Sequence, residues 1–327
     1  MKRYLFISEC LLFLGVMVGA VHATTITYSD KLGRPVTVSV PVKRAVFLIS
    51  YELIPVLDVW TNVVGISRHA YQNDLMKATR PDIERSIPSA GSGIDINIEA
   101  LLRLRPDVVI TWAYKPEAIR FMEEKGLKVI SIYPETLAEL YEVMRLHGRL
   151  FKKEGRIEET IGRMEEIFRL VRERVSNIPV NQRRKVLWLG GRPTSIAGAI
   201  GLTNDIFMMI GGANPASSIP QRNVDVSLER IIGWDPDVIF IWGNARYQSS
   251  DILNNPQWRT IKAVKEKRVY KAPDWSTWSP RLAPVALWMA KKVYPERFQE
   301  VDPERVSDEF HKKVFGVPYA RLNKFDE

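Results

Sequence analysis

Tryptophan, tyrosine and arginine side chains gather directly after the apolar runs of this 327-residue sequence. Aromatic rings supply large contact areas and attract cations, and the arginine guanidinium offers a fork of donors to anionic oxygens. Together they suit a ligand with broad faces and polar edges. The candidate ligand contacts are Tyr51, Trp112, Tyr114, Arg192, Trp242, Trp275, Trp278 and Arg281.

The ends of the predicted strands place several of these side chains. Val108–Ile110 and Val238–Ile241 are continuous apolar runs, as expected of strands buried in a parallel sheet. Trp112 and Trp242 come at their ends. Ligands of open α/β sheets lie beyond the carboxyl ends of the strands, so both indoles are expected to face a ligand. Arg192 follows two glycines, which permit close backbone approach.

The segment Trp275–Arg281 combines two indoles with a guanidinium over a short stretch. In the first interpretation these side chains contact the ligand. In the second, one tryptophan packs in the core and Arg281 only caps a helix. Tyr51, at the start of the helix predicted after the first buried strand, is a further candidate of the same kind.

Catalytic and metal-binding patterns are sparse. The only cysteine is Cys10, and the sequence has neither a Gly-x-Ser-x-Gly elbow nor a phosphate-cradling glycine loop. Beyond the N-terminal segment, His69, His147 and His311 share no ligand spacing, which argues against a dedicated bare-metal site. His69 could supply one ligand to a chelated metal, or be a solvated loop histidine. We therefore expect a protein that is not an enzyme.

The N-terminus predicts export. Lys2 and Arg3 precede an apolar run, and small residues lead up to Ala23. Residues 1–23 are interpreted as a signal peptide cleaved after Ala23, with an uncleaved membrane anchor as the alternative. Cys10 would leave with that segment, so the exported chain would contain no thiol. A protein without an anchor is best retained between two membranes, which makes the periplasm the expected location.

The net charge of +9 does not identify a partner. Lysine and arginine are scattered and interleaved with glutamate, as in residues 154–174. This arrangement is typical of a solvated basic surface, so no nucleic-acid partner is expected.

An internal repeat reveals the elements that position the candidate residues. Asp95–Ala113 (DINIEALLRLRPDVVITWA) matches Asp225–Gly243 (DVSLERIIGWDPDVIFIWG) without a gap. Each copy predicts a short capped helix, a proline that ends it, and a buried strand. One such unit in each half of the chain predicts two similar α/β lobes.

The predicted fold is α/β, with two Rossmann-like lobes containing parallel sheets, joined by a long interlobe helix. The expected boundaries are 24–135 for the N-terminal lobe, 136–180 for the interlobe segment and 181–327 for the C-terminal lobe. Gly148 and Gly155 are expected to divide the interlobe segment into two helices. A helical connection restricts lobe motion more than short strands do, so a small opening is expected.

Several motifs together resemble one family. They are Tyr28–Arg34 (YSDKLGR), Asn97–Leu101 (NIEAL), Arg105–Val109 (RPDVV) and Gly211–Asn214 (GGAN). The chain resembles, over residues 25 to 315, the periplasmic binding proteins for ferric siderophores, vitamin B12 and haem that have a rigid interlobe helix. The resemblance implies a ligand in a shallow cleft between the lobes. The family's fold is also distantly similar to that of metal chelatases, which makes a chelatase the enzymatic alternative. A monomer without a covalently bound cofactor is expected.

The resemblance also implies delivery to the permease dimer of an ABC importer. Family members dock through one surface glutamate in each lobe, and Glu99 and Glu229 match those positions. Both could instead be simple first-turn carboxylates that favour the helix dipole. The expected cargo is an iron- or cobalt-containing metal chelate, first of all a ferric siderophore. A corrinoid, haem and an oxyanion of the molybdate type remain open.

Overall fold

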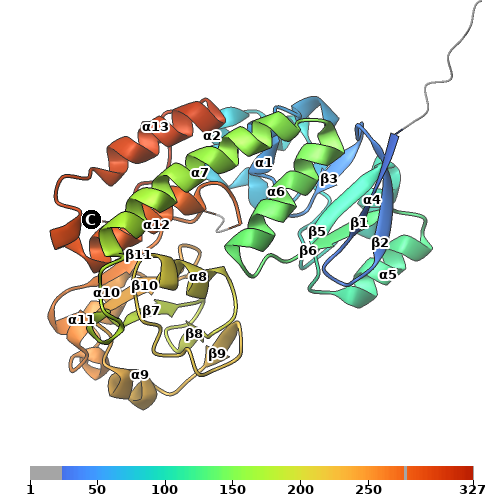
Figure 1. Ribbon diagram of the computed structural model, residues 1–327. Helices are drawn as coiled ribbons and strands as arrows, with labels where there is room; N and C mark the ends of the chain where they lie inside the picture. Colours follow the sequence, from blue (N-terminus) through green and yellow to red (C-terminus); the bar gives the residue numbers. More distant parts are fainter. Residues whose placement is uncertain (1–23, 276–277, 327) are drawn as a thin grey trace, which may run out of the picture.

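The computed structural model describes residues 24–275 and 278–326, and it forms two α/β lobes bridged by long helices (Figure 1). The predicted signal peptide, residues 1–23, lies outside the described residues, as do Ser276 and Thr277 of the aromatic segment. Across the described part of the chain, no helix combines the length and apolarity needed to span a bilayer.

The N-terminal lobe is built on a parallel sheet with strand order β4-β3-β5-β6. An antiparallel hairpin of β1 and β2 flanks it, as the alternation of residues 25–40 predicts. The strands are β1 (Thr24–Ser29), β2 (Pro35–Val40), β3 (Ala45–Phe47), β4 (Val63–Ile66), β5 (Val108–Trp112) and β6 (Val129–Ile132). The helices are α1 (Leu53–Leu57), η1 (Trp60–Asn62), η2 (Arg68–Tyr71), α2 (Asp74–Thr79), α3 (Ile83–Ser86), α4 (Ile98–Leu104) and α5 (Pro116–Glu124).

The C-terminal lobe has a sheet of order β11-β10-β7-β8-β9. β10 is parallel to β7 and β11, while β8 runs antiparallel to β7 and β9, an extension that the sequence did not predict. The strands are β7 (Val186–Leu189), β8 (Ser195–Ala197), β9 (Asn223–Asp225), β10 (Val238–Ile241) and β11 (Val269–Lys271). The helices are η3 (Val180–Gln182), α8 (Leu202–Met209), α9 (Leu228–Trp234), α10 (Ser249–Leu253), η4 (Pro256–Trp258), α11 (Lys262–Lys265), α12 (Leu282–Val293), η5 (Pro295–Arg297), α13 (Pro303–Phe315) and η6 (Tyr319–Arg321).

The sequence repeat is also a structural repeat. The Asn97 side chain accepts a hydrogen bond at the start of α4, and Ser227 does the same for α9. The two helices end at Arg105 and Asp235, both left-handed with φ 46°. A proline and a buried strand, β5 or β10, follow in each copy. The predicted unit of capped helix, proline and strand is therefore present once in each lobe.

Two helices make the interlobe connection, α6 (Leu137–Phe151) and α7 (Glu154–Val175). The predicted division into two helices is present, and it falls between Gly148 and Gly155. The break itself is at Lys152, which is left-handed with φ 56°, and not at either glycine. Gly148 instead allows the helices to pack closely. A Cβ atom at this position would lie 3.1 Å from the Ile157 side chain and 3.2 Å from the Glu154 Cα.

One hydrophobic cluster runs through both lobes. It includes Phe47 of the first sheet, Phe240 of the second, and Phe168 and Leu287 from α7 and α12. Separate clusters cover the opposite faces of the two sheets. Because α7 and α12 pack together across the lobe junction (Figure 1), the helical side of the molecule is a single packed interior. This shared core favours limited lobe motion.

Candidate functional site

Four aromatic rings meet where the N-terminal sheet faces the C-terminal half of the chain. Trp112 ends β5, Tyr114 follows it, and Tyr133 follows β6. Trp278, from the segment before α12, packs edge-on against Trp112 and Tyr133, with centroid distances of 5.6 and 4.6 Å. The ring centroid of Tyr114 lies 6.0 Å from that of Trp112 and 5.7 Å from that of Tyr133. We call these four residues the aromatic cluster.

The sequence predicted three members of this cluster and missed Tyr133. The rule that selected Trp112 would also have selected Tyr133, because it directly follows a buried strand. Burial, together with the nearby Tyr114, raises the pKa of the Tyr133 hydroxyl to about 12. That hydroxyl therefore stays protonated at neutral pH and can donate a hydrogen bond.

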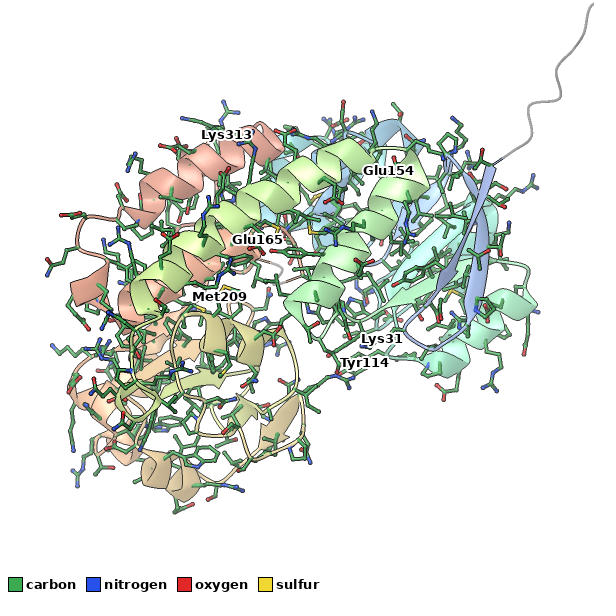
Figure 2. All side chains as sticks on the ribbon, viewed as in Figure 1. Lys31, Tyr114, Glu154, Glu165, Met209 and Lys313 are labelled. Atoms are coloured by element: carbon green, nitrogen blue, oxygen red, sulfur yellow. The ribbon has the colours of Figure 1, made fainter. Side chains whose placement is uncertain are left out.

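A cation from the C-terminal lobe reaches the cluster. The Arg222 guanidinium lies 4.6 Å from the centre of the Tyr133 ring, in cation–π contact. Its Nε also donates to Glu135, whose other carboxylate oxygen accepts from Lys31 at 2.9 Å. Figure 2 places Lys31 and Tyr114 at the lower rim of the N-terminal lobe, across from the C-terminal lobe. No sequence signal marked Arg222, which lies in a loop before β9.

Two polar atoms at the strand ends of the N-terminal lobe are buried without a hydrogen-bond partner among the described residues. One is Nε1 of Trp112, and the other is the Ser50 hydroxyl, whose residue is left-handed with φ 56°. Unpaired buried groups and strained backbone are costly and concentrate at functional sites. Both atoms are candidates for hydrogen bonds to a ligand.

Arg281 occupies a different position from the expected one. Its side chain is fully buried, with 0% exposure, and its Nη2 atom lies 2.8 Å from carboxylate oxygens of both Glu52 and Asp74. These partners belong to the N-terminal lobe, so the ion pairs cross the lobe junction. Burial alone would lower the pKa of Arg281, but the two carboxylates raise it above its ordinary value. The guanidinium is inaccessible in this structure, and we assign it a structural role in place of ligand contact.

Trp275 belongs to the same buried group. Its ring stacks under the Arg281 guanidinium at 4.4 Å, and its Nε1 donates to Asp74 at 3.0 Å. The indole is buried, which fits the interpretation in which one tryptophan of this segment packs in the core. Tyr51 lies nearby and is partly buried, and burial raises the pKa of its hydroxyl strongly. We call Arg281, Glu52 and Asp74 the buried bridge.

The candidates of the C-terminal lobe are open to solvent. Arg192 is exposed and forms an ion pair with Asp225. Trp242 is exposed at the end of β10, and Gly243 after it is required by close packing, because a Cβ there would lie 2.2 Å from the Pro273 carbonyl oxygen. Neither side chain has an aromatic contact with the cluster among the described residues.

The remaining predicted residues lie on helices. His69 is exposed on η2, and no group of three or more histidines, cysteines and carboxylates within residues 24–275 and 278–326 could hold a metal ion. Glu99 and Glu229 are exposed in the first turns of α4 and α9, one in each lobe. Glu99 pairs with Arg103 one turn later at 2.7 Å. Hydrogen bonds from its own backbone and from Ser227 lower the pKa of Glu229.

Two α/β lobes, a shared helical spine and aromatic strand ends define a two-lobed solute-binding protein. The chain belongs to the periplasmic binding protein family, whose pattern matches residues 45–275. As a member of this family it is a periplasmic binding protein of the kind that serves ABC importers.

Similar proteins differ in what their names say they bind. The molybdate-binding protein MolA of Haemophilus influenzae is 26% identical, covering 90% of this chain and 92% of that protein. The Fe(3+)-citrate-binding protein YfmC of Bacillus subtilis is also 26% identical, covering 74% and 76%. The structure of Helicobacter pylori CeuE with Ni(II) bound has a TM-score of 0.82 at 30% identity, covering 90% of this chain and 98% of CeuE.

Proposed function

We propose that this protein captures a metal chelate between its lobes, first of all a ferric siderophore, and delivers it to an ABC importer. The observation that carries the proposal is the aromatic cluster with the Arg222 guanidinium against Tyr133. Ring faces supply contact area for a bulky chelate, and a cation at their edge suits the anionic oxygens at its periphery.

The pairing of three arginines with carboxylates favours a chelate over a small oxyanion as the ligand. Arg192 is paired with Asp225, Arg222 with Glu135, and Arg281 with Glu52 and Asp74. A small oxyanion is held mainly by converging charged or N–H donors, and each of these three would first have to leave a carboxylate. A large chelate can gain most of its contact from the rings and needs few direct ion pairs.

An oxyanion is the second candidate, because the molybdate-binding relative aligns over 90% of this chain. Its binding would require Arg222 or Arg192 to exchange a carboxylate for the anion. Haem and corrinoids offer flat faces to the same rings, and both are included among the ligands tested below.

Titration of tryptophan fluorescence discriminates among these ligands, because Trp112 and Trp278 lie in the cluster. Ferric citrate, a ferric trihydroxamate, a ferric catecholate, haem, cyanocobalamin and molybdate would each be added to the purified protein. We expect a ferric chelate to quench emission at micromolar concentration, and Tyr133→Ala to weaken that binding at least tenfold. Saturation by molybdate alone would establish the oxyanion candidate, and a flat response to every probe would exclude the cluster as the binding site.

We further propose that Glu99 and Glu229 dock the protein on the permease dimer. Support comes from their equivalent places in the two repeats, each exposed in the first turn of a capped helix. Glu99→Lys combined with Glu229→Lys should abolish uptake while ligand affinity stays unchanged. Glu124→Lys, at an exposed position at the end of α5, is the matched control. Normal uptake by the double variant would refute the docking assignment.

The proposal includes export as a monomer after removal of residues 1–23, without enzymatic turnover and without a covalently bound cofactor. The N-terminal sequence of the protein recovered from the periplasm tests the cleavage site after Ala23. Sedimentation of the purified protein tests its monomeric state. Chemical modification of a chelate by the purified protein alone would instead support the chelatase alternative.

A further inference from the structure

We propose that Arg222, Glu135 and Lys31 form an electrostatic latch that holds the two lobes together beside the aromatic cluster. Arg222 belongs to the C-terminal lobe, and Glu135 precedes α6 at the edge of the N-terminal lobe. The distance from Arg222 Nε to the nearest Glu135 oxygen is 2.5 Å. This ion pair joins residues 87 positions apart in the chain.

Glu135 is held in place from two directions. Its second oxygen accepts from Lys31 Nζ, which lies in the turn between β1 and β2 and also contacts Glu139, both at 2.9 Å. Burial acts to raise the pKa of Glu135, but hydrogen bonds from Lys31 and Arg222 lower it below the usual range. Lys31 therefore holds this carboxylate from within the N-terminal lobe, and Arg222 contacts it from the C-terminal lobe.

A second contact reinforces the same place. The Asp205 carboxylate, in the first turn of α8, accepts the backbone N–H of Leu137 at 2.9 Å. Leu137 is the first residue of α6, where free N–H groups and the helix dipole favour an anion. The C-terminal lobe thus contacts the segment before α6 at Glu135, and the first residue of α6 at Leu137.

Exposure makes this contact releasable. The Arg222 side chain is 48% exposed, Glu135 20% and Lys31 28%. Exposed ion pairs contribute little to stability and weaken with added salt. The helical side of the junction, in contrast, is closed by the continuous core and the buried bridge. Opening is therefore expected at the latch, with Arg222 leaving Glu135 and Tyr133 together.

The distance between spin labels on the two lobes tests the latch in ligand-free protein, so its outcome does not depend on the proposed function. Labels would be attached through Glu124→Cys and Ser250→Cys, both exposed, in protein produced without residues 1–23 and therefore without Cys10. Glu135→Gln and Arg222→Gln should each shift the distance to longer values or broaden it. The double variant should shift no further than either single one.

Two further measurements make the result decisive. Glu142→Gln removes a carboxylate that pairs with Arg145 inside α6, so it should leave the distance unchanged. Raising the salt to about 0.5 M should move the native protein toward the Glu135→Gln distance, because screening weakens exposed pairs. The latch is refuted if the native protein and both single variants give one distance at low and high salt.

Discussion

Among the residues that the structure describes, two ionic bridges join the lobes, and they differ in their access to water. The buried bridge places Arg281 between Glu52 and Asp74, with 0%, 1% and 8% of the side chains exposed. The latch joins Arg222 to Glu135 and Lys31 in contact with solvent. Access to water determines whether each bridge can break. Buried charges cannot separate without a large free-energy penalty, whereas exposed charges are rehydrated as they separate. The first bridge fixes the lobes, and the second lets them open.

The largest expected effect comes from removing the cation of the buried bridge. Arg281→Met leaves the buried Glu52 and Asp74 without their guanidinium, which should lower the free energy of unfolding by about 3–5 kcal/mol. Urea denaturation measures this loss.

Neutralising the acids as well should recover part of that stability, since the cost arises from uncompensated charge. The test is the triple variant Arg281→Met, Glu52→Gln, Asp74→Asn. If Arg281→Met costs no more than Arg222→Met, the distinction between the two bridges fails.

Acid should weaken the region around the buried bridge. His311 packs against Trp275, 5.3 Å between ring centres, and burial followed by the charge of Arg281 lowers its pKa from 6.5 to about 4. In the unfolded chain the ring takes up a proton below pH 6.5, while the folded state resists until about pH 4. The contribution of the neutral ring to the free energy of unfolding is thus fully present above pH 6.5. As the pH falls from 6.5 toward 4, this contribution decreases by about 1.4 kcal/mol per pH unit.

Urea denaturation between pH 7 and pH 4 would measure this slope. His311→Asn should reduce the slope by the contribution of one proton. Arg222→Met should leave the slope unchanged above about pH 5.5, where Glu135 is ionised with or without its partner. His147, whose pKa burial likewise lowers to about 4, should give a similar change when replaced. Identical slopes for the native protein and His311→Asn would show that His311 is not held neutral.

The smallest expected effect is the change in the free energy of unfolding when the latch is removed. Arg222→Met should change the free energy of unfolding by less than about 1 kcal/mol, because the pair is exposed. The change should shrink further in high salt. Equilibrium unfolding at low and high ionic strength measures both quantities, and a cost of several kcal/mol independent of salt would place this bridge in the same class as the buried one.

Local signals made the lobes predictable. Asn97 and Ser227 cap their own helices, the following prolines end them, and the apolar runs form buried strands in both copies. The position of the interlobe break was less predictable. Gly148 has a helix-breaking tendency, but it lies inside α6, where the absence of a side chain permits close contact with α7, and the break falls at Lys152.

The candidate site was predicted only in part. Trp112, Tyr114 and Trp278 come together as aromatic strand-end or segment residues. Arg281 and Trp275 carried the same sequence signal, yet they lie inside the lobe junction. Composition and spacing do not distinguish an arginine aimed at a ligand from one aimed at two buried carboxylates.

The sequence alone determined the repeated α/β unit and the helical spine, because caps, prolines and apolar periodicity act over a few residues. The tertiary structure alone decided which charges meet. Arg281 lies more than 200 positions from Glu52 and Asp74, and Arg222 is far along the chain from Glu135. Such pairs depend on how the tertiary structure packs the two lobes together. The pair that this packing excludes from water is permanent, and the pair that it leaves in contact with water is releasable.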